Sequence, residues 1–293
     1  VESLSGYDLV VSSGLIGLSD LLAVARGPVP PLLLYAHETQ LSYPSPSARE
    51  SDLHFAFTDL VNMLASDQVA FNSQSHRTAY LEALPGFLRR LPEHRPMWTV
   101  DRVEEKSSVV YPGIEWDRRD GVDPDAHAAD GGRAPLILWN HRWEFDKNPD
   151  AFFSALREVR RHGARFRLAI LGENFQVVPK PFLAAKEELS EELVHFGYLP
   201  SRSDYHRVLA ESDIVVSTAI QENFGISVME AIAHGALPLL PARLSYPEII
   251  PTDHHDLLFR DEDELVRMLV GALENRRRAP VGLVTHARSF AWP

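Results

Sequence analysis

Two glutamates, Glu222 and Glu230, stand eight residues apart in segment 221–235. The apolar run 214–217 precedes them and is typical of a buried strand, and the turn 223–225 (Asn-Phe-Gly) leads into a helix. In open α/β sheets, ligands bind at the carboxyl ends of strands, and a helix N-terminus presents N–H groups to an anion. Glu222 in the turn and Glu230 in the helix are therefore predicted to contact different parts of one ligand. The alternative is a solvated acid in a turn and an exposed acid on a helix.

Two cations, Arg142 and Lys147, occupy segment 139–149 (WNHRWEFDKNP), which also follows an apolar run. They stand five residues apart in a loop that precedes a predicted helix. Two cations beside a helix N-terminus suit a diphosphate, whose charge is spread over several oxygens. The alternative is a surface cluster of ion pairs with Glu144 and Asp146.

A third polar segment, 34–44 (LYAHETQLSYP), follows another apolar run nearer the N-terminus. His37 and Glu38 are followed by Leu41 where a zinc-binding HExxH motif would need a second histidine, so that motif is absent. One interpretation is a polar loop with one hydrogen-bonded histidine. The functional interpretation is one wall of a cleft between two domains.

The elements that must position these residues come from an alternation of short apolar runs and helical periodicity. This alternation predicts parallel sheets covered by helices on both faces. In the first part of the chain we expect strands at 9–11, 32–35, 69–71 and 109–111, and helices at 18–25 and 53–64. The predicted apolar face of the second helix consists of Leu53, Phe57, Leu60, Val61 and Leu64.

The same alternation restarts after residues 117–135, which lose all periodicity. There we expect strands at 136–139, 166–171, 193–196, 214–217 and 236–240, and helices at 149–161, 226–233 and 262–274, the last of these closing the fold. Asn148 is the predicted N-cap of 149–161, and Ser203 caps a further helix. We therefore predict two doubly wound, Rossmann-like domains facing a cleft: an N-terminal domain at 1–120, a linker at 121–135 and a C-terminal domain at 136–293.

Composition excludes several classes of protein. The 293 residues include 29 basic and 41 acidic side chains, for a formal net charge of −12, which argues against binding nucleic acid by bulk electrostatics. There is no cysteine, so disulfides and thiolate chemistry are excluded. The sequence lacks P-loop, GxGxxG and GxSxG motifs, a membrane-length apolar run and a signal peptide. We expect a soluble, cytoplasmic protein without membrane contact.

The motifs resemble those of a known family. The E-x7-E segment and the R-x4-K loop are similar to those of the retaining, family 4-type glycosyltransferases of GT-B fold. The match is closer to one branch, the tRNA-queuosine alpha-mannosyltransferases, and the segments that carry it are HETQLSYP, FNSQSHRTAYL, LPEHRP, NHRWEFDKNP, LGENF, GYLPSRSDY, ENFGISVMEAI and YPEIIP. Of these, NHRWEFDKNP and HETQLSYP are specific to the branch, whereas E-x7-E is shared by the wider group. The resemblance extends from about Asp8 to Trp292.

This resemblance implies a donor, GDP-mannose, and an acceptor, queuosine in a tRNA anticodon. Arg142 and Lys147 would hold the diphosphate, Glu230 the ribose and Glu222 the transferred sugar. Further donor-binding residues would be Tyr198 at the base and Asn223, Phe224, Gly225 and Ile226 at the sugar and phosphate. The implied catalytic residues are His37, Arg142, Lys147 and Glu222, and the acceptor side comprises His37, Glu38, Gln40 and Tyr43.

The family also begins with a strand and a glycine-rich loop that precede Val1, so we expect an incomplete N-terminal domain and a chain cut at both ends. We expect no cofactor and no metal. Two D-x-D pairs mimic a metal-binding motif of other transferases, but Asp123 and Asp125 lie in the linker, and Asp261 and Asp263 open a helix, where acids favour the dipole. The basic runs at 89–90, 94–95 and 276–278 are candidate tRNA contacts or solvated helix ends. Two alternatives stay open: the same donor chemistry on a lipid, glycan or small molecule, and a non-catalytic protein that binds a nucleotide sugar.

Overall fold

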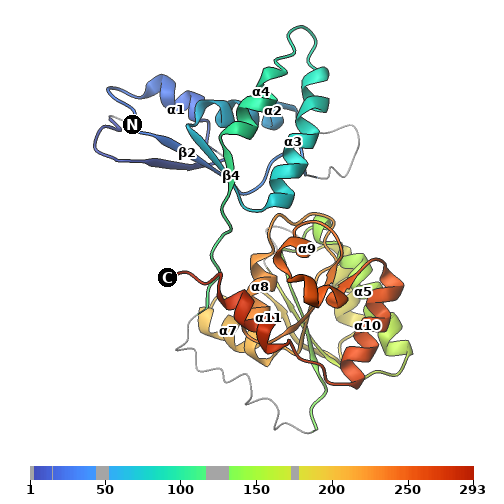
Figure 1. Cartoon of the computed structure of the whole chain (residues 1–293). Coiled ribbons are helices and arrows are strands. Elements are labelled where there is room, and N and C mark those ends of the chain that lie inside the picture. Colours follow the sequence, from blue (N-terminus) through green and yellow to red (C-terminus); the bar gives the residue numbers. More distant parts are fainter. Residues whose placement is uncertain (1–2, 15, 44–52, 117–131, 173–177) are drawn as a thin grey trace. The chain divides into compact units, whose positions relative to one another are not determined.

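The computed structural model describes residues 3–14, 16–43, 53–116, 132–172 and 178–293. The chain divides into two compact units, Val1–Tyr111 and Pro112–Pro293 (Figure 1). Residues 112–116 go with the second unit because Ile114 pairs with Ala291 and its N–H donates to the Phe290 carbonyl at 2.9 Å. The second unit thus begins ahead of the linker expected at 121–135, of which residues 121–131 lie outside the described residues.

The first unit is built on a parallel sheet in which the described strands are β1 (Val10–Ser13), β2 (Leu32–Ala36), β3 (Gln68–Phe71) and β4 (Ser107–Val109). Their order in the sheet, β1-β2-β3-β4, follows their order in the chain. The described helices are α1 (Leu18–Val24), α2 (Leu53–Ala65), α3 (Gln74–Arg89) and α4 (Trp98–Glu105). The core lies where Leu34 and Phe71 of the sheet meet Leu60 and Tyr80 of α2 and α3, all at most 2% exposed.

Two expectations for this unit are wrong. Phe57 is 48% exposed, and the buried face of α2 is formed by Ala56, Leu60 and Met63. Both sets recur at helical spacing, so periodicity alone does not choose between them. The last strand lies at Ser107–Val109 and not at 109–111, because the pairing with β3 ends at Val109 and the next two residues are exposed.

The second unit contains a parallel sheet of six described strands: β5 (Leu136–Asn140), β6 (Arg167–Leu171), β7 (Leu193–Gly197), β8 (Ile214–Val216), β9 (Leu237–Pro241) and β10 (Leu258–Phe259). Every residue of β5 is buried, as expected for a central strand covered on both faces. The strand order is β10-β9-β8-β5-β6-β7. The chain therefore builds outward from β5 on one side and from β8 on the other, and the point between β5 and β8 is where open α/β sheets bind ligands.

Helices cover both faces of this sheet. Their bounds are α5 (Pro149–Arg161), α6 (Lys180–Glu188), α7 (Arg202–Glu211), α8 (Ile226–Ala233), α9 (Tyr246–Ile249), α10 (Glu262–Glu274) and α11 (Val281–Arg288), with 3₁₀ turns η3 (Phe145–Lys147) and η4 (Thr252–Leu257). Helix α5 packs against α6 and α10, whereas α8 packs against α7 and α11 (Figure 1). The predicted bounds of 149–161 and 226–233 are confirmed.

Two local expectations for this unit are corrected, and a third holds in position only. Ser201, not Ser203, caps α7, because its hydroxyl accepts the Asp204 N–H at 3.3 Å. Asn148 is the N-cap residue of α5, as predicted, but its side chain makes no capping hydrogen bond; its φ of 49° places it in the left-handed region, where asparagine is tolerated. Helix α10 is followed by α11, which the sequence pattern did not indicate.

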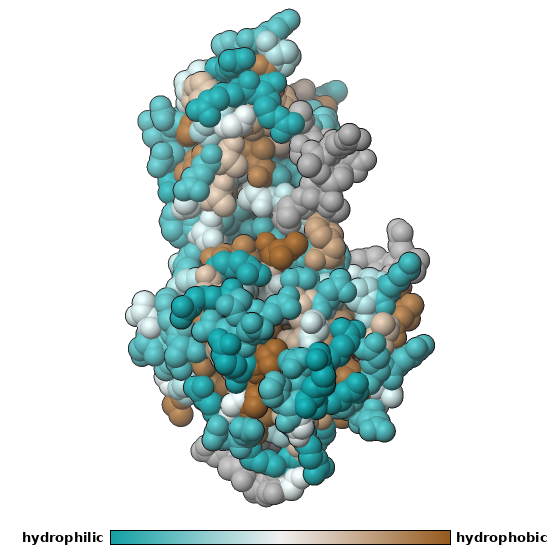
Figure 2. All heavy atoms as spheres, turned by 90° about the vertical axis from the view of Figure 1, so that its right-hand side faces the viewer, coloured by the Kyte–Doolittle hydropathy of each residue, from teal (hydrophilic) through white to brown (hydrophobic). Residues whose placement is uncertain are grey.

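On the face shown in Figure 2, hydrophilic side chains cover most of the area and hydrophobic ones are interspersed among them. Among the described residues, no helix combines the length and apolar character needed to cross a membrane.

Candidate active site

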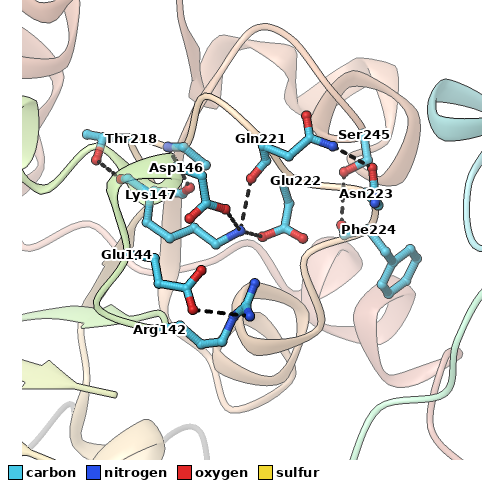
Figure 3. A network of polar contacts seen from close by, with 12 residues as sticks. Arg142, Glu144, Asp146, Lys147, Thr218, Gln221, Glu222, Asn223, Phe224 and Ser245 are labelled. Atoms are coloured by element: carbon cyan, nitrogen blue, oxygen red, sulfur yellow. Dashed lines mark hydrogen bonds and ion pairs between the residues drawn. The ribbon is translucent and has the colours of Figure 1, made fainter. Parts of the chain in front are cut away.

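The loops that follow β5 and β8 meet at the edge of the second sheet (Figure 3). The N–H groups of Ile220 and Gln221 donate to the Asp146 carbonyl at 2.8 and 3.3 Å. The Thr218 hydroxyl donates to the Lys147 carbonyl at 2.9 Å. These bonds fix the R-x4-K loop against the start of the E-x7-E segment, so their side chains share one site.

Lys147 lies at the centre of this site and is buried. Its Nζ donates to the Gln221 carbonyl at 2.9 Å and to Glu222 Oε2 at 3.3 Å, and it lies 3.2 Å from Asp146 Oδ2 (Figure 3). Burial by itself would lower the pKa of Lys147, but the two carboxylates reverse the shift and raise it. The ammonium group is therefore held charged beside two acids.

Glu222 is the ionised partner of Lys147. Burial would raise the pKa of Glu222, but the nearby Lys147 charge and the backbone hydrogen bond from Phe224 lower it overall. The raised pKa of Lys147 and the lowered pKa of Glu222 both favour the charged forms, so both groups stay charged near neutral pH.

His141 adds a neutral group to this cluster. The ring is 4% exposed, and burial together with the Lys147 charge lowers its pKa to about 4. Within the described residues, its Nε2 has no hydrogen-bond partner. A neutral imidazole next to Lys147 avoids the repulsion that a second buried cation would cause.

Arg142 differs from Lys147 in its surroundings. Its side chain is 48% exposed, and Nη1 lies 3.3 Å from Glu144 Oε1. The predicted alternative, a surface ion pair, thus describes Arg142 and Glu144, whereas Lys147 and Asp146 are buried. An exposed pair of this kind contributes little to stability, so the guanidinium can exchange its partner for an anion at low cost.

The N-terminus of α8 lies next to these cations. Gly225 is its N-cap with a φ of 96°, a conformation that favours glycine, and a Cβ there would approach Tyr246 to 3.2 Å. The Ser245 hydroxyl donates to the Phe224 carbonyl at 3.1 Å, and Asn223 Oδ1 accepts from the Gln221 amide at 2.9 Å. The turn is thereby held so that the first N–H groups of α8, beginning at Ile226, are available to an anion.

Glu230 lies within α8 and is 7% exposed. Tyr205 donates its hydroxyl to Oε2 at 2.8 Å, and the Glu115 N–H donates to Oε1 at 3.3 Å. Burial raises the pKa of Glu230. It also raises the pKa of Tyr205 well above the ordinary value, so the phenol stays protonated and donates a hydrogen bond to Glu230. Each carboxylate oxygen has a second lone pair and can still accept from a ligand hydroxyl.

A cavity of about 370 Å³ opens beside these residues. Its lining comprises Glu115, Asn140, His141, Arg142, Leu171, Gly172, Tyr198, Leu199, Pro200, Arg202 and Tyr205. Tyr198, the predicted base-contacting residue, is 63% exposed at this cavity. The cavity volume is within the range of small-molecule sites.

The His37 loop belongs to the first unit. His37, Glu38 and Gln40 line a cavity of about 760 Å³ there, and Tyr43 is not among its lining residues. Asp59 from α2 fixes the loop by accepting the Gln40 N–H at 2.8 Å. Burial lowers the pKa of His37, which favours the neutral ring.

A buried network holds this loop from β3 and α3. His76 contacts Thr39 Oγ1 through Nε2 at 2.9 Å and Asn72 Oδ1 through Nδ1 at 2.8 Å. The Asn72 amide donates to the His37 carbonyl at 2.9 Å. Burial lowers the pKa of His76 to about 4, so both ring nitrogens serve the network without a charge.

Sequence reasoning missed several residues of these sites: His141, Tyr205, Glu115, Asp59 and His76. His141, Tyr205 and His76 stand in the quoted segments NHRWEFDKNP, GYLPSRSDY and FNSQSHRTAYL, which is the one signal that marks them. Glu115 and Asp59 lie outside the quoted segments and contact the sites from distant parts of the chain. Among the described residues, no group of three or more histidine and acidic side chains is arranged to hold a metal ion, and Asp261 instead caps α10 by accepting the Glu264 N–H at 2.8 Å. Asp123 and Asp125 lie outside the described residues.

The fold is similar to that of solved structures. Sucrose-phosphate synthase from Thermosynechococcus elongatus superposes with a TM-score of 0.71 at 15% identity, covering 97% of this chain and 69% of that one. Anabaena HepE in complex with UDP and glucose superposes with a TM-score of 0.64 at 17% identity, covering 97% and 72%. The predicted GT-B fold, with two parallel α/β units, is confirmed.

Sequence relatives agree with the fold. The chain is 32% identical over 259 residues to a tRNA-queuosine alpha-mannosyltransferase of Drosophila melanogaster, covering 87% of this chain and 66% of the relative. It is 26% identical over 137 residues to a GDP-mannose:cellobiosyl-diphosphopolyprenol alpha-mannosyltransferase of Xanthomonas campestris, covering 46% and 36%. The chain spans less than two thirds of the length of these relatives.

Family matches cover nearly the whole chain. Residues 1–114 match the family described as tRNA-queuosine alpha-mannosyltransferase N-terminal, and residues 126–282 match glycosyl transferases group 1. The resemblance seen in the motifs is thereby confirmed. Because the match to glycosyl transferases group 1 covers more than half of its length, the chain belongs to that family.

Proposed function

We propose that this protein transfers mannose from GDP-mannose to queuosine in tRNA, with retention of configuration. The observation that carries the donor half is the meeting of Arg142, Lys147, Glu222 and the α8 N-terminus at one sheet edge. The match of residues 1–114 to the queuosine-specific family supports the acceptor half.

Donor binding requires Lys147 to exchange partners. Its contacts with Glu222 and Asp146, at 3.3 and 3.2 Å, are longer than the 2.9 Å bond to the Gln221 carbonyl. A diphosphate oxygen would replace one of the longer contacts. Release of Glu222 would leave its carboxylate able to accept from hydroxyls of the transferred sugar, so donor binding and sugar positioning are coupled.

The reaction breaks the bond between the sugar carbon and the diphosphate oxygen and forms a bond to the acceptor hydroxyl. Arg142, Lys147 and the α8 N-terminus stabilise the charge that develops on the departing diphosphate. The leaving oxygen lies on the same face as the incoming hydroxyl and accepts its proton. These cationic groups supply the electrostatic stabilisation in this proposal, and we expect activity to persist in EDTA.

Contact with tRNA phosphates is proposed for the basic runs at 89–90 and 94–95 of the first unit. Arg89, Arg90 and Arg95 are exposed there. In the other run, by contrast, Arg277 and Arg278 lie 3.4 and 3.1 Å from Asp256 and Asp213. Replacing Arg89 and Arg90 by alanine should flatten the salt dependence of tRNA affinity, as counterion release requires.

Mass spectrometry of tRNA nucleosides tests the function. Queuosine-containing tRNA incubated with the protein and GDP-mannose should yield a nucleoside heavier by one hexose, and tRNA lacking queuosine should not. The Xanthomonas relative, whose name specifies a diphosphopolyprenol acceptor, supports a second candidate with the same donor. Mannose transfer to a polyprenol-linked sugar, with none to tRNA, would favour that acceptor. Binding of GDP-mannose without transfer to any acceptor would favour a non-catalytic nucleotide-sugar-binding protein.

A further inference from the structure

An exposed ion pair lies on the wall of the 370 Å³ cavity. Arg202 Nε, at the start of α7, is 3.0 Å from Glu115 Oε2, and the two side chains are 63% and 49% exposed. Ion pairs as exposed as this contribute little to stability. What points to a role in binding is the position of both residues on the cavity wall.

The pair lies next to the carboxylate proposed to hold the donor ribose. The backbone N–H of Glu115 donates to Glu230 Oε1, and Tyr205, which also lines the cavity, donates to Oε2. Arg142, the proposed diphosphate contact, lines the same cavity. A nucleotide bound by Arg142 and Glu230 would thus extend its base into the cavity, toward Glu115 and Arg202.

The chemistry of the pair selects among bases. A carboxylate only accepts hydrogen bonds and a guanidinium only donates them. Guanine presents adjacent donors, N1–H and the N2 amino group, on one edge, and acceptors, O6 and N7, on another. In nucleic-acid recognition, arginine donates to the O6 and N7 acceptors of guanine. Uracil has one N–H between two carbonyl oxygens, and these oxygens would repel a carboxylate. Adenine lacks O6, which is one of the acceptors for arginine.

We propose that Glu115 and Arg202 select guanine as the base of the donor nucleotide. Glu115 accepts from N1–H and the N2 amino group, and Arg202 donates to O6 or N7. The inference rests on the proposed function and deepens it, because it assigns the base specificity to two residues. The bond from the Glu115 backbone N–H to Glu230 links the residue proposed for the base to the residue proposed for the ribose.

Calorimetric titration with GDP, IDP and UDP tests this assignment, because IDP carries guanine without its N2 amino group. The unmodified protein should bind GDP about tenfold to a hundredfold more tightly than IDP, the range for a hydrogen bond to a charged group. Glu115→Ala, which keeps the backbone bond to Glu230, should bring the GDP and IDP affinities together. Arg202→Ala should weaken both by a similar factor and leave their ratio intact.

Arg207→Ala is the matched control, since Arg207 is on the same helix, pairs with Asp204 at 2.7 Å and is not among the cavity-lining residues. It should change no nucleotide affinity. An unchanged GDP-to-IDP ratio in Glu115→Ala, or equal binding of GDP and UDP to the unmodified protein, would overturn the inference while leaving the nucleotide site standing. Failure of the unmodified protein to bind GDP would overturn the proposed donor and this inference together.

Discussion

Lys147 and Glu222, from loops after two neighbouring strands, lie with Nζ and Oε2 3.3 Å apart in a buried site. With Asp146 they form a cluster of one cation and two acids. The residue proposed for the diphosphate is therefore also the counter-charge that makes burial of Glu222 tolerable. Folding and donor binding depend on the same ammonium group.

Removal of that ammonium should destabilise the second unit. Lys147→Met leaves the buried Asp146 and the partly buried Glu222 without their cation, and breaking a buried pair in this way costs about 3–5 kcal/mol. Arg142→Ala breaks only an exposed pair and should cost less than about 1 kcal/mol. Urea unfolding followed by tryptophan fluorescence measures both, and equal costs for the two variants would contradict the description of Lys147 as the buried counter-charge.

Arg142 should instead matter for the ligand. Arg142→Ala should weaken GDP binding by roughly 1.5–3 kcal/mol, the contribution of a hydrogen bond to a charged group. Arg161, exposed at the end of α5 and paired with Glu158 at 2.6 Å, provides the control, and Arg161→Ala should leave GDP affinity unchanged. Unaltered affinity for GDP in Arg142→Ala would remove this residue from the site.

Glu222 and Glu230 should separate by ligand. Glu230→Ala should weaken GDP and GDP-mannose alike, since both carry the ribose. Glu222→Ala should weaken only GDP-mannose, because Glu222 is proposed to contact the sugar and its loss leaves Lys147 available to the phosphate. Titration of both ligands against both variants decides this, and parallel losses of the two ligands in the two variants would refute the division of roles.

Asp59 should give the first unit a distinctive pH dependence. Burial raises its pKa from 3.8 to about 6, although the Gln40 hydrogen bond opposes the shift. The folded state thus holds the proton more tightly than the unfolded state. The stabilisation from this group is fully present below pH 4 and is lost as the pH rises through 6. The free energy of unfolding then falls by at most about 3 kcal/mol.

Asp59→Asn, whose side-chain oxygen can still accept from Gln40, should remove that fall. The difference in unfolding free energy between the variant and the unmodified protein should grow between pH 4 and pH 6 and then level off. A difference that stays constant over this range would show that Asp59 is ionised at its ordinary pKa.

Local patterns predicted much of the fold because the second unit follows them closely. Helix α5 has predicted and observed bounds of 149–161, since its apolar stripe is continuous and Pro149 begins it. Phe57 shows the limit: two overlapping stripes in α2 share Leu60 and both satisfy the helical period, and only packing in the folded unit selects Ala56 and Met63 over Phe57. Helix α3 carries Pro85 within its span, which weakens any local signal for a single long helix.

Local rules predicted which loops form the site but not the contacts between residues distant in sequence. The strand-end rule brought Lys147 and Glu222 into one site because both loops follow strands at the switch point. Asp146 had a local interpretation as a surface acid, and its burial depends on backbone bonds from Ile220 and Gln221, distant in sequence. Glu115 reaches Glu230 across 115 residues, so neither periodicity nor spacing indicates the contact.

The His37 loop should govern transfer without affecting the nucleotide. His37→Ala should reduce mannose transfer by about a hundredfold, because a lost contact near the reacting carbon misplaces the substrates. His76→Ala should reproduce much of that loss, since it removes the contacts that hold Thr39 and Asn72 around the loop. GDP affinity should persist in both variants, because the residues proposed for GDP all belong to the second unit.

Two further variants serve as controls for the His37 loop. His76→Gln, which can still reach one partner, should recover part of the activity, and the surface variant His162→Ala should be fully active. Loss of GDP binding in His37→Ala, or full transfer in His76→Ala, would show that this loop does not serve the reacting end of the donor.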